Sequence, residues 1–308
     1  MLKIGVVGTG HLGKIHVKNL LEMSMDFDLR GFFDTDISKV KEVEEEFKLN
    51  FFPHLEDLIQ SVDALLIASP TNSHFSIAVQ ALKNGKHVFI EKPVCLTSEE
   101  SKKLLRYAQE ASVVVQVGHV ERFNPALLAA TPFIEQPLFI ESRRMAPFQK
   151  RGTDVSVVYD LMIHDIDIAL KVINSNVKKM ASFGMKVLSD SIDFASVRLE
   201  FENGCMANIT ASRVSDARER KTSFLMADRQ VSIDYLNKEA TIVQISPQNI
   251  QMKSDAIPVD DLNAIKRELS SFALSIQEGK KPTVSLEDAH RALQIAELIS
   301  DQIQDSSY

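Results

Sequence analysis

Tryptophan is absent from the 308-residue sequence, and cysteine occurs only twice, as Cys95 and Cys205. The two cysteines form no CxxC or zinc-ligand spacing, which argues against a disulfide framework or a zinc site and indicates reduced thiols in a cytoplasmic protein. No apolar run reaches the roughly 18–20 residues that span a bilayer, so we expect no membrane partner. The N-terminus enters a predicted strand without a charged leader or cleavage site, which predicts no signal peptide.

Positive charge is also scarce, because 35 Lys and Arg stand against 42 Asp and Glu and leave a net charge of −7. Nucleic acid requires a basic surface, so we expect no nucleic-acid partner. The hydrophobic content of 44% and the charged content of 25% are typical of a soluble globular protein. The length exceeds one ordinary domain and suggests two.

The chain begins with an apolar strand that enters a glycine-rich turn, and residues 3–13 read Lys-Ile-Gly-Val-Val-Gly-Thr-Gly-His-Leu-Gly. In a Gly-x-Gly-x-x-Gly turn, Gly8 permits the tight bend and Gly10 removes the Cβ that would strike a dinucleotide's phosphates. Gly13 lets the helix approach the strand. The helix start offers N–H groups to the pyrophosphate, so the turn predicts a dinucleotide site. The other turn residues that we assign to this site are Thr9, His11 and Leu12.

A carboxylate follows the second predicted strand, Asp28–Phe33, at Asp34, which lies 21 residues after Gly13. Such a carboxylate accepts hydrogen bonds from the adenosine ribose hydroxyls and repels a 2′-phosphate. No Arg or Lys follows Asp34 until Lys39. The predicted cofactor is therefore NAD, with NADP less favoured.

The pattern along the chain predicts an α/β protein of two domains. Residues 1–118 alternate apolar strands with helices, which indicates a Rossmann domain with a doubly wound parallel sheet. From about Pro137 the strands become longer and alternate apolar with polar residues, and Asn203-Gly204 is a hairpin signal. We therefore assign residues 119–284 to a substrate-binding and oligomerisation α/β domain with an open, mostly antiparallel sheet.

Two motifs follow predicted strands of the Rossmann domain, at the sheet edge where open α/β folds bind ligands. In the segment 68–74, Ala-Ser-Pro-Thr-Asn-Ser-His, small residues suit a backbone that lies along the cofactor. The alternative for Thr71 or Asn72 is a helix cap alone. The residues of this segment that we assign to cofactor binding are Ser69, Pro70, Thr71, Asn72 and His74.

The second motif is Glu91-Lys92-Pro93, after the fourth predicted strand. Both Glu91 and Lys92 are assigned to the cofactor site, and Lys92 also to the substrate. A lysine that points into a cleft beside an oxidised nicotinamide has a lowered pKa, and it donates a hydrogen bond to a reacting oxygen or relays a proton. A solvated surface pair is the alternative.

A predicted helix, about Val157–Ile173, carries Asp160, His164 and Asp167 among apolar residues. Asp160 and His164 are four residues apart and therefore share one helix face. In a nicotinamide enzyme this pair fits a general base with its carboxylate partner, because the imidazole pKa lies near working pH. A core histidine is one alternative. A metal on the face that includes Asp167 is another, but no further ligand motif completes a site, so we expect no metal.

Taken in order, the glycine-rich turn, Ser-Pro-Thr-x-x-x-His, Glu-Lys-Pro and Asp-x-x-x-His resemble the Gfo/Idh/MocA oxidoreductases. The resemblance implies that Lys92, Asp160 and His164 are catalytic in NAD-dependent oxidation of a sugar hydroxyl to a ketone. It also implies that the C-terminal helix, in residues 285–308, packs back on the Rossmann domain, and that the protein is a homodimer or homotetramer. Many members have glycine where this chain has Met162, a difference that concerns the substrate and not the reaction class.

Residues 118–125, Gly-His-Val-Glu-Arg-Phe-Asn-Pro, are similar to the segment of family members that act on nucleotide sugars. The resemblance is to those that oxidise the 3-hydroxyl of UDP-N-acetylglucosamine for 3-amino-sugar synthesis in lipid A or surface polysaccharide. It implies that Arg122 and Asn124 face the substrate or the nicotinamide. The alternative is that Asn124 begins a helix and that Arg122 is solvated.

Four cations occur within nine positions of this acidic chain, at residues 143, 144, 150 and 151. Arg143 and Arg144 point to opposite faces of a strand, so at most one serves a given site. Lys150 and Arg151 precede the predicted catalytic helix, and we assign both to a substrate diphosphate, with a solvated charge cluster as the alternative. Other functions left open are a free-sugar or inositol dehydrogenase, a reductase of a double bond or imine, and an NAD-sensing regulatory protein.

Overall fold

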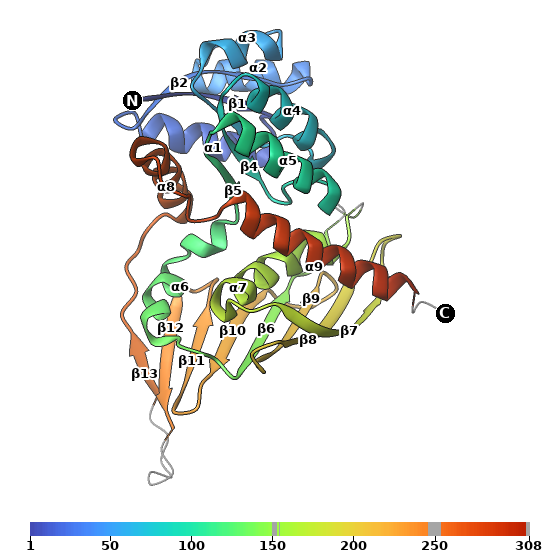
Figure 1. Cartoon of the computed structure of the whole chain (residues 1–308). Helices are drawn as coiled ribbons and strands as arrows, with labels where there is room; N and C mark the ends of the chain where they lie inside the picture. The colour runs from blue at the N-terminus through green and yellow to red at the C-terminus, as the bar shows by residue number, and fades with distance from the viewer. Residues whose placement is uncertain (150–152, 154, 246–253, 306–308) are drawn as a thin grey trace. The chain divides into compact units, whose positions relative to one another are not determined.

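The computed structural model describes residues 1–149, 153, 155–245 and 254–305 (Figure 1). The chain divides into two compact units. The first contains Met1–Val120 and Ala264–His290, and the second contains Glu121–Asn263 and Arg291–Tyr308. No helix within the described ranges is long and apolar enough to cross a membrane.

Within the described residues, the first unit holds a five-stranded parallel sheet in the order β2-β1-β3-β4-β5. The strands are β1 (Leu2–Val7), β2 (Phe27–Phe33), β3 (Ala64–Ile67), β4 (His87–Glu91) and β5 (Val115–Gly118). A single parallel bridge between Phe32 and Phe51 extends the sheet beyond β2. Counted as a strand, it makes the order that of a doubly wound dinucleotide-binding sheet, so the predicted Rossmann fold is confirmed.

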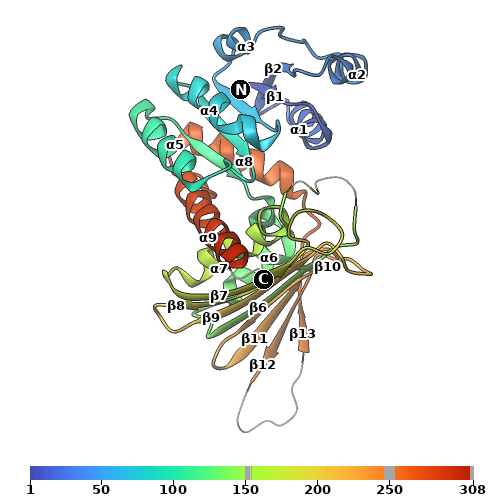
Figure 2. The same cartoon turned by 90° about the vertical axis from the view of Figure 1, so that its right-hand side faces the viewer.

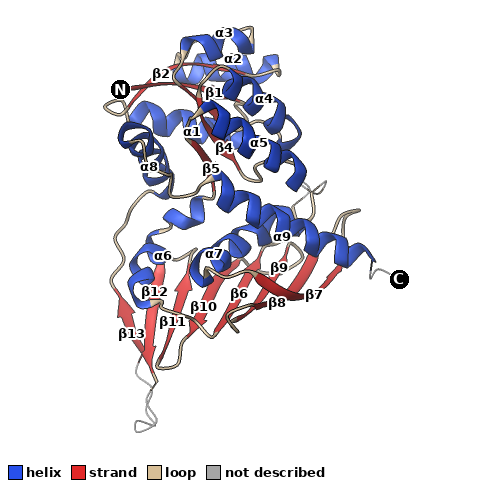
Figure 3. Cartoon of the chain, viewed as in Figure 1, coloured by secondary structure: helices blue, strands red, loops and turns tan. Residues whose placement is uncertain are grey.

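Helices bury both faces of this sheet, as expected for parallel strands (Figure 3). They are α1 (His11–Glu22), α2 (Ile37–Phe47), α3 (Leu55–Ser61), α4 (Thr71–Lys83), α5 (Ser98–Ala111) and α8 (Ala264–Glu278). The N-terminus of α5 is capped by Thr97, whose Oγ1 accepts a hydrogen bond from Glu100 N–H at 3.2 Å. α8 comes from far along the sequence, and its Phe272 ring packs edge-on against Phe89 of β4 at 5.8 Å between centroids.

The second unit is built on an eight-stranded sheet in the order β13-β12-β11-β10-β6-β9-β8-β7, as far as the described residues show. Only the β6–β9 pair is parallel among these neighbours, so the predicted open, mostly antiparallel sheet is confirmed. The strands are β6 (Phe139–Met145), β7 (Val177–Met185), β8 (Phe194–Phe201), β9 (Met206–Ser212), β10 (Glu219–Leu225), β11 (Arg229–Asp234), β12 (Glu239–Gln244) and β13 (Ser254–Ile257).

One face of this sheet is covered by helices (Figures 1 and 2). They are α6 (Pro125–Ala130), α7 (Ile163–Ile173) with the π-helical turn η3 (Val158–Met162) before it, and the later part of α9 (Leu286–Asp305). Apolar side chains of α7 such as Ile166 and Ala169 join sheet residues such as Val197 and Ile209 in one buried core. Alternate residues of β6, β8 and β9 are buried in this core, which agrees with the alternation of apolar and polar residues in the sequence.

The C-terminal helix differs from its prediction. Only Leu286–His290 of α9 group with the first unit. Four later residues, spaced four, three and four apart on one helix face, join the core of the second unit: Ala292, Ala296, Ile299 and Ile303. α8, which we had placed in the substrate domain, groups instead with the Rossmann unit. The predicted boundary at 118/119 lies two residues before the observed division.

A carboxylate organises the loop between β7 and β8. Asp193 is fully buried, and its Oδ2 accepts hydrogen bonds from the N–H groups of Val187 (2.8 Å), Leu188 (2.7 Å) and Ser189 (2.9 Å). Its Oδ1 lies 3.1 Å from Nε of Arg213. Burial alone would raise the pKa of Asp193, but hydrogen bonds from the Ser189 hydroxyl and the loop N–H groups outweigh it and lower the pKa to about 2.

We expect Asp193→Asn to lower the free energy of unfolding by about 1–3 kcal/mol at neutral pH, because hydrogen bonds to a charged group are lost. A lowered native pKa adds stability above the unfolded value of 3.8, and this is lost as pH falls toward 2. Urea unfolding across this range should therefore show the difference between the two proteins narrowing with acid. Asp190→Asn, an exposed change in the same loop, is the control. Equal destabilisation by both changes would contradict the assignment.

Candidate active site

The glycine-rich turn of the first unit is shaped by contacts between backbone atoms. Gly8 has φ +86°, in the region that favours glycine, and a Cβ there would overlap the backbone of Ser69. A Cβ on Gly13 would overlap the carbonyl oxygen of Gly8. Both glycines are therefore required for the chain to fold at this turn.

Gly10 is different, because nothing in the described structure requires glycine there. Its φ of −63° suits any residue, and a Cβ built on it meets no described atom within 4 Å. The residue directly precedes α1, whose N-terminus receives no side-chain cap from the described residues. A methyl group at Gly10 would fill the space in front of the helix N–H groups, where a pyrophosphate binds. These residues fit NAD.

Asp34 is attached to the same turn. Its Oδ2 accepts hydrogen bonds from the N–H of Thr9 at 2.7 Å and from the Thr9 hydroxyl at 2.9 Å, while Oδ1 accepts from Asp36 N–H at 2.9 Å. An ionised carboxylate has about four acceptor positions, so these three donors leave capacity for a ribose hydroxyl. Asp34 is half-buried at the end of β2.

The loop after β3 is held by His74 of α4. The ring is 1% exposed, with Nε2 at 2.8 Å from the carbonyl oxygen of Ser69 and Nδ1 at 3.0 Å from that of Pro93. Burial lowers the pKa of His74, against the effect of these carbonyls. The predicted cofactor residue His74 thus joins two loops through their backbone, and its ring is not exposed to a ligand.

The other residues of this loop lie at the surface or half-buried at the start of α4. Pro70 and Asn72 are exposed, and Thr71 is half-buried. The helix cap is Pro70, and no described side chain bonds to the first N–H groups. Capping therefore does not explain Thr71 or Asn72, and both stay predicted cofactor residues.

Glu91 is paired with a histidine that sequence reasoning missed. His16 of α1 is fully buried and its Nε2 lies 2.6 Å from Glu91 Oε1, while Glu91 Oε2 accepts a hydrogen bond from Lys92 N–H at 3.2 Å. A Cβ on Gly118 of β5 would meet this carboxylate at 2.7 Å. Glu91 therefore positions the backbone of the half-buried Lys92. The sequence did contain a signal for a buried His16, because this histidine lies on the apolar stripe of α1, three residues after Gly13.

In the second unit, the predicted catalytic helix is only partly α-helical. Asp160 lies in η3, where the backbone bonds run from i to i+5, and His164 follows in the first turn of α7. Asp160 and His164 are thus separated by the end of a π turn and the start of an α-helix, and their shared face stays a prediction. Single π turns of this kind occur frequently at functional sites. Both side chains are half-buried.

The two remaining acids of α7 are buried and paired with arginines. Asp165 accepts hydrogen bonds from Arg144 at 2.7 Å and 3.1 Å, and Arg144 also donates to Glu121 at 2.8 Å. Burial would lower the pKa of Arg144, but these two carboxylates more than offset it and raise the pKa. Asp167 accepts two bonds of 2.6 Å from Arg122.

These pairs decide between alternatives that the sequence left open. Arg122 is 6% exposed and is bound to Asp167, so the alternative prediction of a solvated Arg122 is wrong. Asn124 does begin a helix, because its Oδ1 accepts a hydrogen bond from Ala126 N–H at 3.1 Å. Its Nδ2 donates to Glu121 at 3.1 Å. Contact of Arg122 and Asn124 with a substrate stays a prediction.

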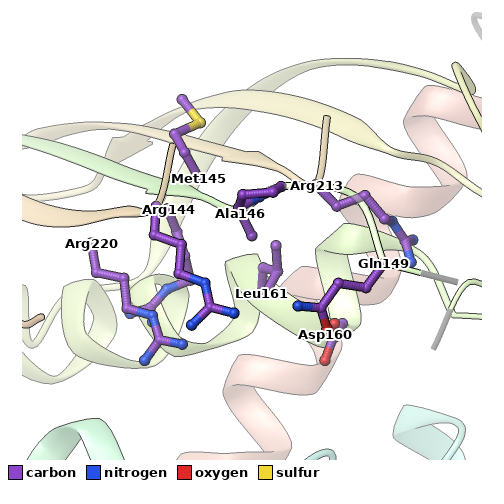
Figure 4. A pocket seen from close by; sticks show the side chains of 10 residues that line it. Arg144, Met145, Ala146, Gln149, Asp160, Leu161, Arg213 and Arg220 are labelled. Atoms are coloured by element: carbon purple, nitrogen blue, oxygen red, sulfur yellow. The ribbon is translucent and has the colours of Figure 1, made fainter. Parts of the chain in front are cut away.

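Asp160 lines a pocket of about 210 Å³ that lies within the second unit (Figure 4). Its described lining includes four arginines: Arg144, Arg213, Arg218 and Arg220.

The other residues predicted near the substrate lie elsewhere. Arg143 points to the other sheet face, as predicted. It is exposed, and its Nη2 lies 3.7 Å from Glu219 Oε2. Met162 is fully buried in the core. Lys150 and Arg151 lie outside the described residues.

Comparison with known proteins identifies the class. Residues 2–119 match the description "Oxidoreductase family, NAD-binding Rossmann fold", and residues 136–232 match "GFO/IDH/MocA C-terminal domain". The UDP-N-acetylglucosamine 3-dehydrogenase of Acidithiobacillus ferrooxidans is 32% identical over 284 residues, which cover 89% of this chain and 88% of that protein. The protein is therefore an NAD-binding oxidoreductase. It belongs to the Gfo/Idh/MocA family, as the order of its motifs indicated.

Further relatives differ in the substrates that their names state. The NAD-dependent scyllo-inositol 2-dehydrogenase of Bacillus subtilis is 26% identical over 96% of this chain and 92% of its own length. The solved structure of the Acidithiobacillus ferrooxidans enzyme superposes with a TM-score of 0.93 at 30% identity, covering 99% of this chain and 98% of that chain. A levoglucosan dehydrogenase in complex with NADH and L-sorbose superposes with a TM-score of 0.89 at 20% identity, covering 99% of this chain and 97% of that chain, which shows the shared fold.

The glycine turn gives a prediction with a matched pair of variants. Gly10→Ala should change the free energy of unfolding by less than about 1 kcal/mol, because its backbone and surroundings accept a methyl group. It should weaken NAD binding at least about tenfold, because the methyl group occupies the phosphate position. Gly13→Ala should destabilise the protein by about 1–3 kcal/mol through overlap with Gly8. Thermal unfolding and NAD titration measure both, and normal NAD affinity in Gly10→Ala would refute the assignment.

Proposed function

We propose that the protein is an NAD-dependent dehydrogenase that oxidises the 3-hydroxyl of UDP-N-acetylglucosamine to a ketone. The observation that carries this proposal is how the acids are distributed on η3 and α7. Asp165 and Asp167 are neutralised by buried arginines, whereas Asp160 lines a pocket rich in arginine, and both Asp160 and His164 remain half-buried. Asp160 lies beside cations that attract an anionic substrate, and with His164 it supplies an acid and an imidazole for the chemistry.

Likeness to a nucleotide-sugar enzyme supports the substrate. The UDP-N-acetylglucosamine 3-dehydrogenase relative matches along 89% of this chain at 32% identity. We infer that residues of the glycine-rich turn, Asp34 and the loop 69–72 hold the cofactor. Asp34 favours NAD over NADP, because its carboxylate repels a 2′-phosphate.

Oxidation of a hydroxyl removes a proton from oxygen and a hydride from carbon, and acceptance of that hydride is the chemistry that bound NAD supplies. His164 takes the hydroxyl proton, since an imidazole titrates near working pH. Asp160 orients His164 or accepts a hydrogen bond from a neighbouring hydroxyl. Lys92 stabilises the oxygen as it becomes a carbonyl, and Glu91 fixes the backbone N–H of Lys92 for this purpose.

An inositol or free-sugar dehydrogenase is the second candidate, favoured by the likeness to a scyllo-inositol 2-dehydrogenase over 96% of this chain. The deciding experiment incubates purified protein and NAD with UDP-N-acetylglucosamine, N-acetylglucosamine or inositols. Each is tested with and without 2-oxoglutarate, which reoxidises a retained cofactor in some relatives. A UDP-sugar product lighter by two hydrogen atoms supports the proposal. Product only from inositol or free sugar overturns it.

The division of roles is tested by substitution. We expect Lys92→Met and His164→Asn each to reduce kcat by about 10²–10⁴-fold, the usual contribution of acid–base groups, while NAD affinity is retained. Lys103→Met and His54→Asn change the same residue types at exposed positions and should leave kcat unchanged. Steady-state kinetics and NAD titration are the measurements. Loss of NAD binding together with turnover would contradict these roles.

A further inference from the structure

The arginines of the pocket differ in how well their charges are neutralised. Arg144 is bound to Asp165 and Glu121, and Arg213 lies 3.1 Å from Asp193. Both guanidinium groups are therefore buried beside matching carboxylates. Arg218 and Arg220 are instead exposed at the same pocket. The positive charge available to a ligand comes from these two.

Arg220 occupies an unfavourable position in the sheet. In the antiparallel pair of β10 and β6 it lies directly opposite Arg144, and like charges in that relation destabilise a sheet. Its Nη1 is 3.4 Å from Glu121 Oε1, an oxygen that already accepts a hydrogen bond from Arg144 at 2.8 Å. Burial and the charge of Arg144 lower the pKa of Arg220, and Arg218 acts in the same direction. Arg144 has Asp165 as a second carboxylate, so of the two arginines Arg220 has the longer and more exposed carboxylate contact.

Figure 4 shows Arg144 and Arg220 together on one side of the pocket, and Asp160, Gln149 and Arg213 on another. The exposed Arg220 lies on the first side and the acid Asp160 on the second, so the first side attracts a phosphate group more strongly. A neutral sugar hydroxyl suits Asp160, which accepts its hydrogen bond.

We propose that Arg218 and Arg220, backed by Arg144, bind the diphosphate of a nucleotide-sugar substrate. Guanidinium groups form forked, charge-assisted hydrogen bonds with phosphate oxygens, and two of them match a group with two phosphates. A diphosphate here also adds negative charge beside Arg220, whose contact with Glu121 is long at 3.4 Å. The sugar attached to it then extends toward Asp160. This inference rests on the proposed function and adds to it the residues that select a nucleotide sugar over a free sugar.

The test is calorimetric titration of the protein saturated with NAD, which occupies the cofactor's own phosphate site. The probes are UDP, inorganic pyrophosphate, N-acetylglucosamine 1-phosphate and uridine. We expect UDP to bind at least about tenfold more tightly than uridine, and more weakly as salt increases. Pyrophosphate should compete with UDP. If the sugar 1-phosphate binds as tightly as UDP, the site takes one phosphate and the diphosphate proposal is wrong.

Substitutions of the pocket arginines test whether UDP binds in this pocket. Arg218→Gln and Arg220→Gln should each weaken UDP binding about tenfold, since each removes a charge-assisted contact. Lys221→Gln removes the same charge from the next residue of β10, on the opposite sheet face, and should leave UDP affinity unchanged. Arg220→Gln should also leave the melting temperature equal or higher, because the opposed charges are relieved. Equal losses in Arg220→Gln and Lys221→Gln, or none in either arginine variant, would overturn the proposal.

Measurements of turnover distinguish a failure of this inference from a failure of the proposed function. With UDP-N-acetylglucosamine, Arg218→Gln and Arg220→Gln should raise KM about tenfold with kcat retained, as for contacts made equally in ground and transition states. If the substrate is oxidised with unchanged KM in both variants, the proposed function stands and the diphosphate site is wrong. If UDP binding depends on the arginines but no UDP-sugar is oxidised, the site stands and the proposed function is wrong.

Discussion

Buried arginine–carboxylate pairs hold α7 against the sheet of the second unit, and the arrangement of the site depends on them. Arg144 of β6 binds Asp165 of α7 together with Glu121, and Arg122 binds Asp167 by two hydrogen bonds. Such pairs gain little net stability over apolar residues, but removing one partner leaves an uncompensated buried charge and costs about 3–5 kcal/mol. Geometry is what they provide. They fix the rotation of α7, which carries the half-buried His164 and follows the half-buried Asp160 of η3.

Carboxylates at strand ends play a comparable part in the first unit. Asp34 follows β2 and binds the turn at Thr9, and Glu91 ends β4 and binds both His16 and Lys92 N–H. Parallel strands bring these ends to one edge of the sheet, where loops from different strands are joined by side chains. His74 adds a further link between the loops at Ser69 and Pro93. The proposed cofactor and lysine positions are thus determined by a connected set of polar contacts.

The pocket at Asp160 contains a pair of arginines that is unfavourable for stability and that suits the proposed binding of an anionic substrate. A sheet designed for stability alone would not place Arg220 opposite Arg144 with a carboxylate shared between them. Local arrangements that lower stability, such as like charges opposite one another in a sheet, are expected at functional sites. The exposed guanidinium group of Arg220, which lies opposite Arg144, is also what would attract an anionic substrate to a protein of net charge −7. The proposed substrate and the proposed site are linked by this one feature.

Local patterns in the sequence determined the features that depend on neighbours along the chain. The glycine turn, the cap of α5 by Thr97, the two sheet types and the opposite directions of Arg143 and Arg144 all follow from backbone conformation or from a period of two. The family was recognised from local motifs as well, because the glycine turn is followed in order by Ser-Pro-Thr-x-x-x-His, Glu-Lys-Pro and Asp-x-x-x-His.

Only the tertiary structure decided how charges and apolar stripes are paired between distant segments. Asp160, Asp165 and Asp167 look alike in sequence, but Asp165 and Asp167 pair with arginines 21 and 45 residues away, and Asp160 lines the pocket. His16 meets Glu91 across 75 residues, and the apolar stripe of α9 joins the core of the second unit. Spacing along a helix does not reveal which distant surface a face will meet. The π turn at Asp160 was likewise not predicted, because sequence periodicity assumes a regular helix.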